Sequence, residues 1–129
     1  MNALLFIILG YKGVPMLSHT DVVEHIYKAL DDKKAQDITI MDVSKITTLA
    51  DYFIIATGTS STHINALCHH VEKELAKEGF ILAHKEGYVN GDWVLLDYHD
   101  FVIHVFNSEL RAYYSLERIW SDAKFIELG

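Results

Sequence analysis

The segment that decides the fold is Gly91–Phe106, GDWVLLDYHDFVIHVF. Its two apolar halves, Trp93–Tyr98 and Phe101–Phe106, predict a β-hairpin, because aromatic, β-branched and leucine residues dominate both. Successive strand side chains point to opposite faces, so the first strand divides into two sets. These sets are Trp93, Leu95 and Asp97 on one face, and Val94, Leu96 and Tyr98 on the other. Both sets are mostly apolar, so the hairpin needs cover from two directions.

The rest of the chain alternates between helical and strand patterns. After the small and polar residues Gly58–Ser61, apolar side chains recur at helical spacing and form one stripe: Ile64, Leu67, Cys68, Val71 and Leu75. Before this stripe we expect a helix over about 18–34 and strands over 38–43 and 52–57. The helix that carries the stripe should end at Gly79 and be followed by a strand over 80–84, the turn Asn90–Gly91 and the hairpin. One or two helices should then run from a Ser108 cap to about Trp120. This order predicts an α/β fold, a mixed β-sheet with packed helices.

Length and composition limit the class of protein. The 129 residues suit one domain, and half of them are apolar or aromatic. A formal charge of −7 opposes the attraction to phosphates on which nucleic-acid binding depends, so direct specific binding of nucleic acid is not expected. The acidic balance favours encounter with a basic protein. The single cysteine excludes an internal disulfide, and the apolar run Ala3–Leu9 is far shorter than the roughly 20 residues of a membrane span, so we expect a cytoplasmic protein without a membrane anchor.

No residue pattern predicts a catalytic, cofactor or metal site. The eight histidines follow no recognised ligand spacing, and Cys68 falls on the apolar stripe, where a buried residue is expected. Gly58–Ser61 lacks the lysine of a phosphate-binding loop and is better explained as a helix cap. Asp97 and Asp100 are three residues apart, whereas metal-binding carboxylates on one strand face are normally separated by two. We expect them to be solvated turn residues or contacts to a partner.

The segment Glu86–Leu110 is unusual because it carries five acidic residues and no lysine or arginine. Its acidic side chains alternate with aromatic ones, as in interfaces that have aromatic anchors at the centre and charge at the rim. The alternative is that the aromatic residues are core and the acidic residues are solvated loops. The sequence leaves both interpretations open.

Three motifs together resemble the ribosomal silencing factor family, also called the Iojap family. They are DYFIIATG at Asp51–Gly58, the hairpin GDWVLLDYHDFVIHVF, and RAYYSLERIWSDA at Arg111–Ala123. Their order and spacing agree with that family over roughly residues 17–123. The resemblance implies a nucleotidyltransferase-like topology without the catalytic motif, and the sequence also lacks the Gly-Ser followed closely by Asp-x-Asp of those enzymes.

The resemblance also implies a function. Family members bind the fourteenth protein of the large ribosomal subunit at the intersubunit face, block joining of the subunits and so slow translation under nutrient limitation. It is compatible with a homodimer in the free state. The rival hypothesis is a nucleotidyltransferase-type enzyme acting on a nucleotide. For the silencing factor, the expected partner-binding residues lie in the hairpin: Trp93, Leu96, Asp97, Tyr98 and Asp100.

The family pattern gives no role to the first 15 residues. They are expected to be an apolar extension that adds a short strand to a sheet edge, before a domain over residues 16–129.

Overall fold

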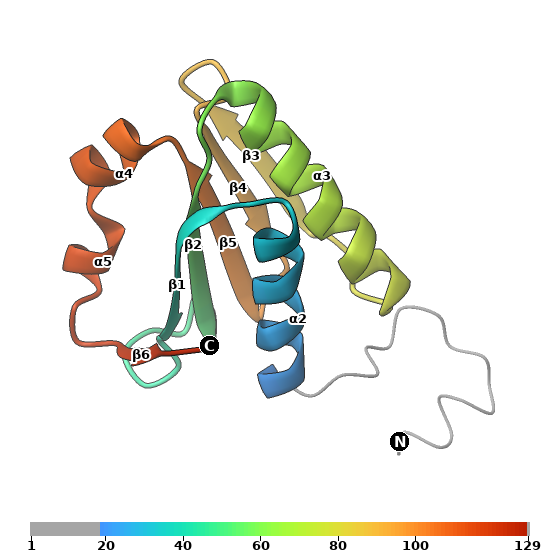
Figure 1. Cartoon of the computed structure of the whole chain (residues 1–129). Coiled ribbons are helices and arrows are strands. Elements are labelled where there is room, and N and C mark those ends of the chain that lie inside the picture. Colours follow the sequence, from blue (N-terminus) through green and yellow to red (C-terminus); the bar gives the residue numbers. More distant parts are fainter. Residues whose placement is uncertain (1–18, 129) are drawn as a thin grey trace.

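The hairpin of residues 93–106 lies in a six-stranded mixed sheet with the strand order β3-β4-β5-β2-β1-β6 (Figure 1). The computed structural model describes residues 19–128. The strands are β1 (Gln36–Asp42), β2 (Tyr52–Thr57), β3 (His84–Tyr88), β4 (Trp93–Asp97), β5 (Phe101–Phe106) and β6 (Lys124–Ile126). Neighbouring strands pair antiparallel except β2 and β5, which are parallel. The predicted α/β class with a mixed sheet is confirmed.

One face of the sheet is covered by α2 (His19–Asp32) and α3 (Ser61–Lys77), which lie side by side in Figure 1. The buried residues of α3 are the five of the predicted stripe. Its first turn is capped by Ser60, whose side chain accepts a hydrogen bond from the His63 backbone N–H at 3.0 Å, as expected for the polar segment after Gly58. These helices pack on one set of hairpin side chains, which includes Val94, Leu96 and Tyr98.

The other face is covered only in part, by α4 (Ser108–Tyr114) and α5 (Leu116–Ile119). Leu110, Leu116 and Trp120 pack against a second buried cluster, which is built on β1 and β2 and includes Met41 and Phe53. Figure 1 shows these two helices on the side of the sheet opposite α2 and α3, and the Tyr114 ring of α4 lies 4.7 Å from the Trp93 ring of β4. The second face therefore has helical cover over only part of the sheet.

Arg111 connects α4 to the ends of β1 and β2. Its guanidinium donates to the hydroxyls of Thr57 (2.8 Å) and Thr39 (2.9 Å) and to the backbone oxygen of Asp37 (2.5 Å), and its Nε donates to Glu117 (3.2 Å). Its side chain is 11% exposed. Four hydrogen bonds thus satisfy a largely buried cation and fix where α4 lies.

Two local predictions were wrong, and one strand was not predicted. A strand was expected over residues 80–84, but β3 begins only at His84. Phe80 instead closes the end of α3, because its N–H donates to the Leu75 oxygen and its ring packs on Phe101. The cap of α4 is Asn107, whose side chain accepts from the Leu110 N–H, rather than Ser108. Strand β6 was not predicted, since three residues give too little pattern.

The turn at Asn90–Gly91 is present and joins β3 to β4. Val89, Asn90 and Gly91 all have positive φ, which asparagine and glycine tolerate best. The extension over residues 1–15, and the edge strand suggested for it, lie outside the described residues.

Candidate functional site

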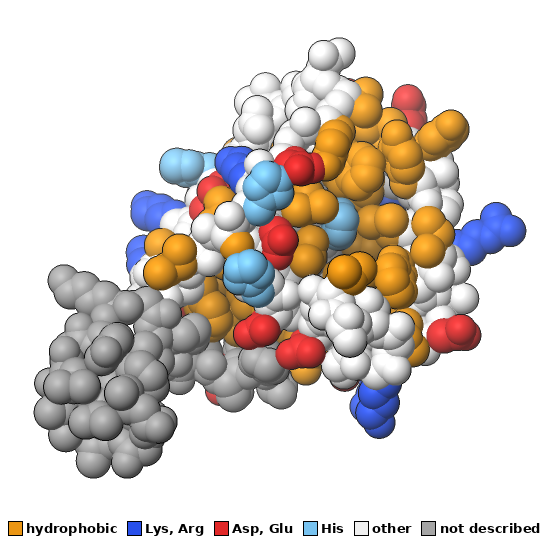
Figure 2. Space-filling model, turned by 180° about the vertical axis from the view of Figure 1, so that it is seen from behind, with side chains coloured by type: hydrophobic (Ala, Val, Ile, Leu, Met, Phe, Trp, Pro, Cys, Tyr) orange, Lys and Arg blue, Asp and Glu red, His pale blue; other side chains and the backbone are white. Residues whose placement is uncertain are grey.

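The side of β3, β4 and β5 that faces away from α2 and α3 is called here the open face. The strand register arranges it in three rows: Tyr88, Trp93 and Phe106; Glu86, Leu95 and His104; and His84, Asp97 and Val102. Figure 2 shows this side of the molecule, where hydrophobic side chains gather around a histidine and acidic and histidine side chains lie beside them. Trp93, Leu95 and Val102 are partly buried and keep accessible surface. The open face is thus a mainly apolar surface with a charged border.

Trp93 is the centre of an aromatic cluster on this face. Its ring lies 4.8 Å from Phe106, 4.7 Å from Tyr88 and 4.7 Å from Tyr114 of α4, measured between centroids. These distances are within the range of favourable ring packing. Tyr113, the neighbour of Tyr114 in α4, is 80% exposed, so aromatic surface continues from the sheet onto α4.

His104 lies in the middle row, and the indole N–H of Trp93 donates to its Nδ1 at 3.2 Å. The residue is 7% exposed, and burial lowers the pKa of His104 from 6.5 to about 4. A histidine with this pKa is uncharged near neutral pH. The centre of the open face therefore carries a neutral imidazole.

The acidic border lies along β3 and the β4–β5 turn. Glu86 pairs with Nε2 of His84 at 2.6 Å, and Asp97 accepts from the His99 backbone N–H at 2.8 Å. Asp100 follows in the same turn and is exposed. Acidic groups thus flank the apolar surface on one side.

The five residues predicted for partner binding do not share one surface. Trp93 and Asp97 belong to the open face, and Asp100 lies in the turn beside it. Leu96 (0% exposed) and Tyr98 (7%) belong to the core under α2 and α3, and burial raises the pKa of the Tyr98 hydroxyl. Their prediction as contact residues is corrected here, since they offer a partner almost no side-chain surface.

Strand alternation alone groups Leu95 with Trp93 and Asp97, yet Leu95 was not among the predicted contacts. Tyr88, His104 and Tyr114 were also missed. Their signal was indirect, because Tyr88 and His104 join the surface only through the pairing of β3, β4 and β5, and Tyr114 through the position of α4.

The other candidate sites in the described part of the chain contain no catalytic set of side chains. The hollow beside Gly58 and Thr59 is lined by one carboxylate, that of Glu109, among its described residues. His63 is a structural link, since its Nδ1 accepts from the Thr59 N–H (2.9 Å) and its Nε2 lies 2.8 Å from the Lys33 oxygen. Cys68 is buried, which raises the pKa of its thiol to about 12. Within residues 19–128 no group of three or more histidine, cysteine, aspartate or glutamate side chains could hold a metal ion.

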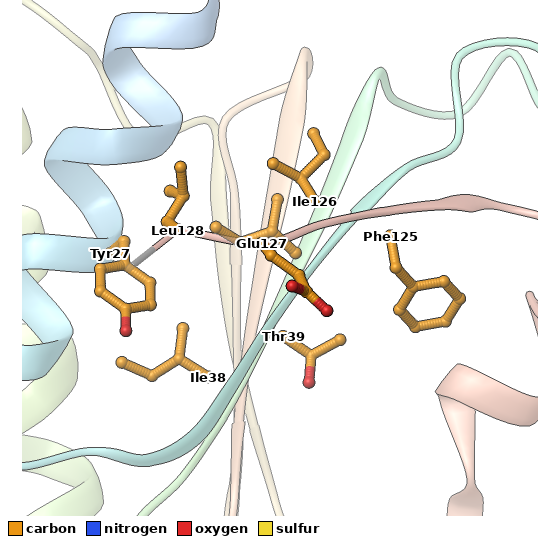
Figure 3. Close-up of a pocket in the computed structure, with 8 residues that line it drawn as sticks. Tyr27, Ile38, Thr39, Phe125, Ile126, Glu127 and Leu128 are labelled. Carbon is orange, nitrogen blue, oxygen red and sulfur yellow. The ribbon is translucent and has the colours of Figure 1, made fainter.

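A cavity of about 390 Å³ lies at the opposite edge of the sheet, between α2, β1 and the C-terminal segment (Figure 3). Tyr27, Ile38 and Leu128 line one side of it, and Phe125 lies at the other end. Glu127 supplies the one carboxylate among its eight lining residues. A single carboxylate gives no acid–base pair, and the cavity is separated from the open face by the width of the sheet.

The family described as ribosomal silencing factor during starvation matches residues 17–129. The chain belongs to this family. A ribosomal silencing factor from Halalkalibacterium halodurans is 37% identical over 112 residues, which are 87% of this chain and 96% of that protein. A mouse protein named mitochondrial assembly of ribosomal large subunit protein 1 is 30% identical over 80% of this chain and 46% of its own length.

The fold agrees with this family. A crystal structure of a protein from Chromobacterium violaceum superposes with a TM-score of 0.78 at 35% identity, covering 81% of this chain and 88% of that one. Family membership implies ribosome-associated regulation of translation, which is a regulatory and not an enzymatic role. In the described part of the chain no helix is long and apolar enough to cross a membrane.

Proposed function

We propose that the protein represses translation by binding the fourteenth protein of the large ribosomal subunit with its open face, and so blocks joining of the two subunits under nutrient limitation. In this proposal it acts in the cytoplasm, by steric exclusion and without a cofactor. The observation that carries the proposal is the open face itself: a sheet surface around Trp93 and Leu95 that α4 and α5 cover only in part, in a chain of the silencing factor family.

The chemistry of the open face suits a basic protein. Apolar and aromatic side chains at its centre supply desolvated contact area, and Glu86, Asp97 and Asp100 border it in a segment without lysine or arginine. Negative charge at the border speeds encounter with a positively charged surface. The name of the mouse relative supports the large subunit as the assembly concerned.

Exposed apolar surface of this kind also suits self-association. We propose that two free copies cover their open faces against each other as a homodimer, and that the ribosomal protein competes for the same surface.

Co-sedimentation tests the proposal. The chain should pellet with isolated large subunits, and not with small subunits or joined ribosomes, in which the intersubunit face is occupied. Equal binding to small subunits, or binding to joined ribosomes without dissociating them, would contradict steric exclusion.

A pair of leucine variants tests the surface. Leu95→Asp places a charge in the open face and should weaken large-subunit binding by about 2 kcal/mol or more, roughly thirtyfold. The control is Leu49→Asp, on a leucine that is 70% exposed in the connection between β1 and β2. It should bind as the wild type does. If both variants melt normally and bind equally well, the open face is not the docking surface.

A further inference from the structure

His104 is a polar group within an apolar environment. Its cross-strand neighbours are Leu95 on β4 and Ile55 on β2, and its same-face neighbours along β5 are Val102 and Phe106. The ring of Phe53 meets it edge-on at 6.0 Å. Burying the two ring nitrogens of a histidine costs free energy that an apolar side chain of similar size would not cost, so filling space alone does not explain a histidine at this position.

The hydrogen bond from Trp93 determines which ring nitrogen carries the proton. An indole N–H can only donate, so Nδ1 of His104, at 3.2 Å, must accept. The neutral imidazole has one proton, which therefore lies on Nε2. The lowered pKa of His104 agrees with a neutral ring at pH 7.

The Nε2–H group thus has a fixed role as a donor. Within the described part of the chain, no side chain or backbone oxygen accepts a hydrogen bond from Nε2, and this atom is not fully enclosed by protein. It therefore retains contact with solvent from the open face. When a partner covers that face, water is displaced and the donor requires a new acceptor.

We infer that His104 is a specificity-determining residue of the open face, and that the surface which docks there presents a hydrogen-bond acceptor, such as a carbonyl or carboxylate oxygen, to its Nε2–H. The inference rests on the proposed function, because it takes the docked surface to be that of the large subunit. Apolar contact alone would allow many different surfaces to bind here. The donor adds a chemical requirement, since a surface without the acceptor would leave the desolvated Nε2–H without a hydrogen bond.

Two amide variants separate this role from a structural one. In His104→Gln the terminal NH₂ can take the place of Nε2–H while the acceptor for Trp93 is lost; in His104→Asn the side-chain oxygen can take the place of Nδ1 while the distal donor is lost. The probe is isolated large ribosomal subunits. Gln should bind within about threefold of wild type and Asn at least about tenfold more weakly, the loss expected when the acceptor on the partner is left without its donor. A residue that merely supports Trp93 would give the reverse order, and that order would overturn the inference.

A second measurement uses the free full-length chain. A two-bond ¹H–¹⁵N correlation spectrum at pH 7 should show the Nε2–H tautomer for His104; an Nδ1–H tautomer or an imidazolium would overturn the inference independently of any ribosome. If the wild type binds no large subunits, the proposed function fails. If it binds and both amide variants match it, only the role of His104 fails.

Discussion

At the scale of single residues, the buried His104 makes stability depend on pH. The unfolded chain takes up this proton near pH 6.5 and the folded chain near pH 4, so acidification favours the unfolded state in between. The contribution of His104 to the free energy of unfolding is fully present above pH 6.5 and is lost as the pH drops toward 4. Between pH 7 and pH 5 the wild type should lose about 2 kcal/mol from this group.

Urea unfolding at both pH values measures the loss, with His104→Gln as control, because glutamine does not titrate. The carboxyls of Asp42 and Glu74, whose pKa values are lowered from 3.8 and 4.5, titrate below this window. An equal loss in wild type and variant would show that His104 is not the group responsible.

At position 58 the packing leaves no room for a side chain, so only glycine fits. A Cβ built there would lie 2.6 Å from Cγ1 of Ile64, which is fully buried in the first turns of α3. Gly58→Ala should therefore destabilise the fold by about 1–3 kcal/mol through overpacking. Gly87→Ala is the matched control, since nothing lies within 4 Å of its Cβ position. Thermal melting of the two variants should differ by several degrees, and equal melting temperatures would refute the clash.

At the scale of elements, Arg111 is expected to hold α4 on the sheet. Arg111→Lys keeps the charge but replaces a fork of donors with one ammonium, so the bonds to Thr39, Thr57 and Glu117 cannot all persist. The expected cost is about 2 kcal/mol. Arg118→Lys, at an exposed position of α5, should change stability by less than about 0.5 kcal/mol. Chemical denaturation compares them, and a tolerated Arg111→Lys would mean that apolar packing alone positions α4.

The sequence predicts elements well where one physical constraint dominates. The apolar stripe of α3 recurs at helical spacing in a 17-residue helix with a capping residue at its start, so the spacing and the cap predict the same helix. Strand β3 could not be found by the same reasoning, because it is an edge strand with mostly exposed side chains and has no apolar alternation. The apolar Phe80 and Leu82 before it pack on the core from a connecting segment.

The candidate site illustrates the same limit. Alternation places Trp93 and Leu96 on opposite faces, but both faces of β4 are apolar, so the sequence does not tell which one the helices cover. That choice depends on the crossing of α3 over the sheet, a long-range arrangement. Only the fold assigns Trp93 and Asp97 to the open face and Leu96 and Tyr98 to the core.

At the scale of the whole molecule, the acidic border should govern the rate of association. Replacing both Asp97 and Asp100 with Asn keeps side-chain size and should slow binding to large subunits and weaken its salt dependence, with little change in melting temperature. Asp31→Asn with Asp32→Asn removes the same charge at exposed positions at the end of α2 and is the control. Stopped-flow association at several ionic strengths distinguishes them. Equal slowing in both pairs would point to net charge rather than to the border.

Deleting residues 1–15 should leave large-subunit binding unchanged, because the family match begins at residue 17 and the open face is built from residues 84–106. Co-sedimentation of the shortened chain measures this. A truncated protein that melts normally but no longer pellets with large subunits would show that the extension takes part in docking.

The parallel pairing of β2 with β5 constrains the order of events during synthesis. Tyr52 pairs with Phe101, so this ladder closes only after nearly fifty intervening residues have left the ribosomal exit tunnel. The rows of the open face need β5 as well, and Tyr114 arrives later still. A nascent chain therefore has no assembled open face until β5 and α4 have left the tunnel, so the surface proposed to bind ribosomes forms only after most of the described fold has been synthesised.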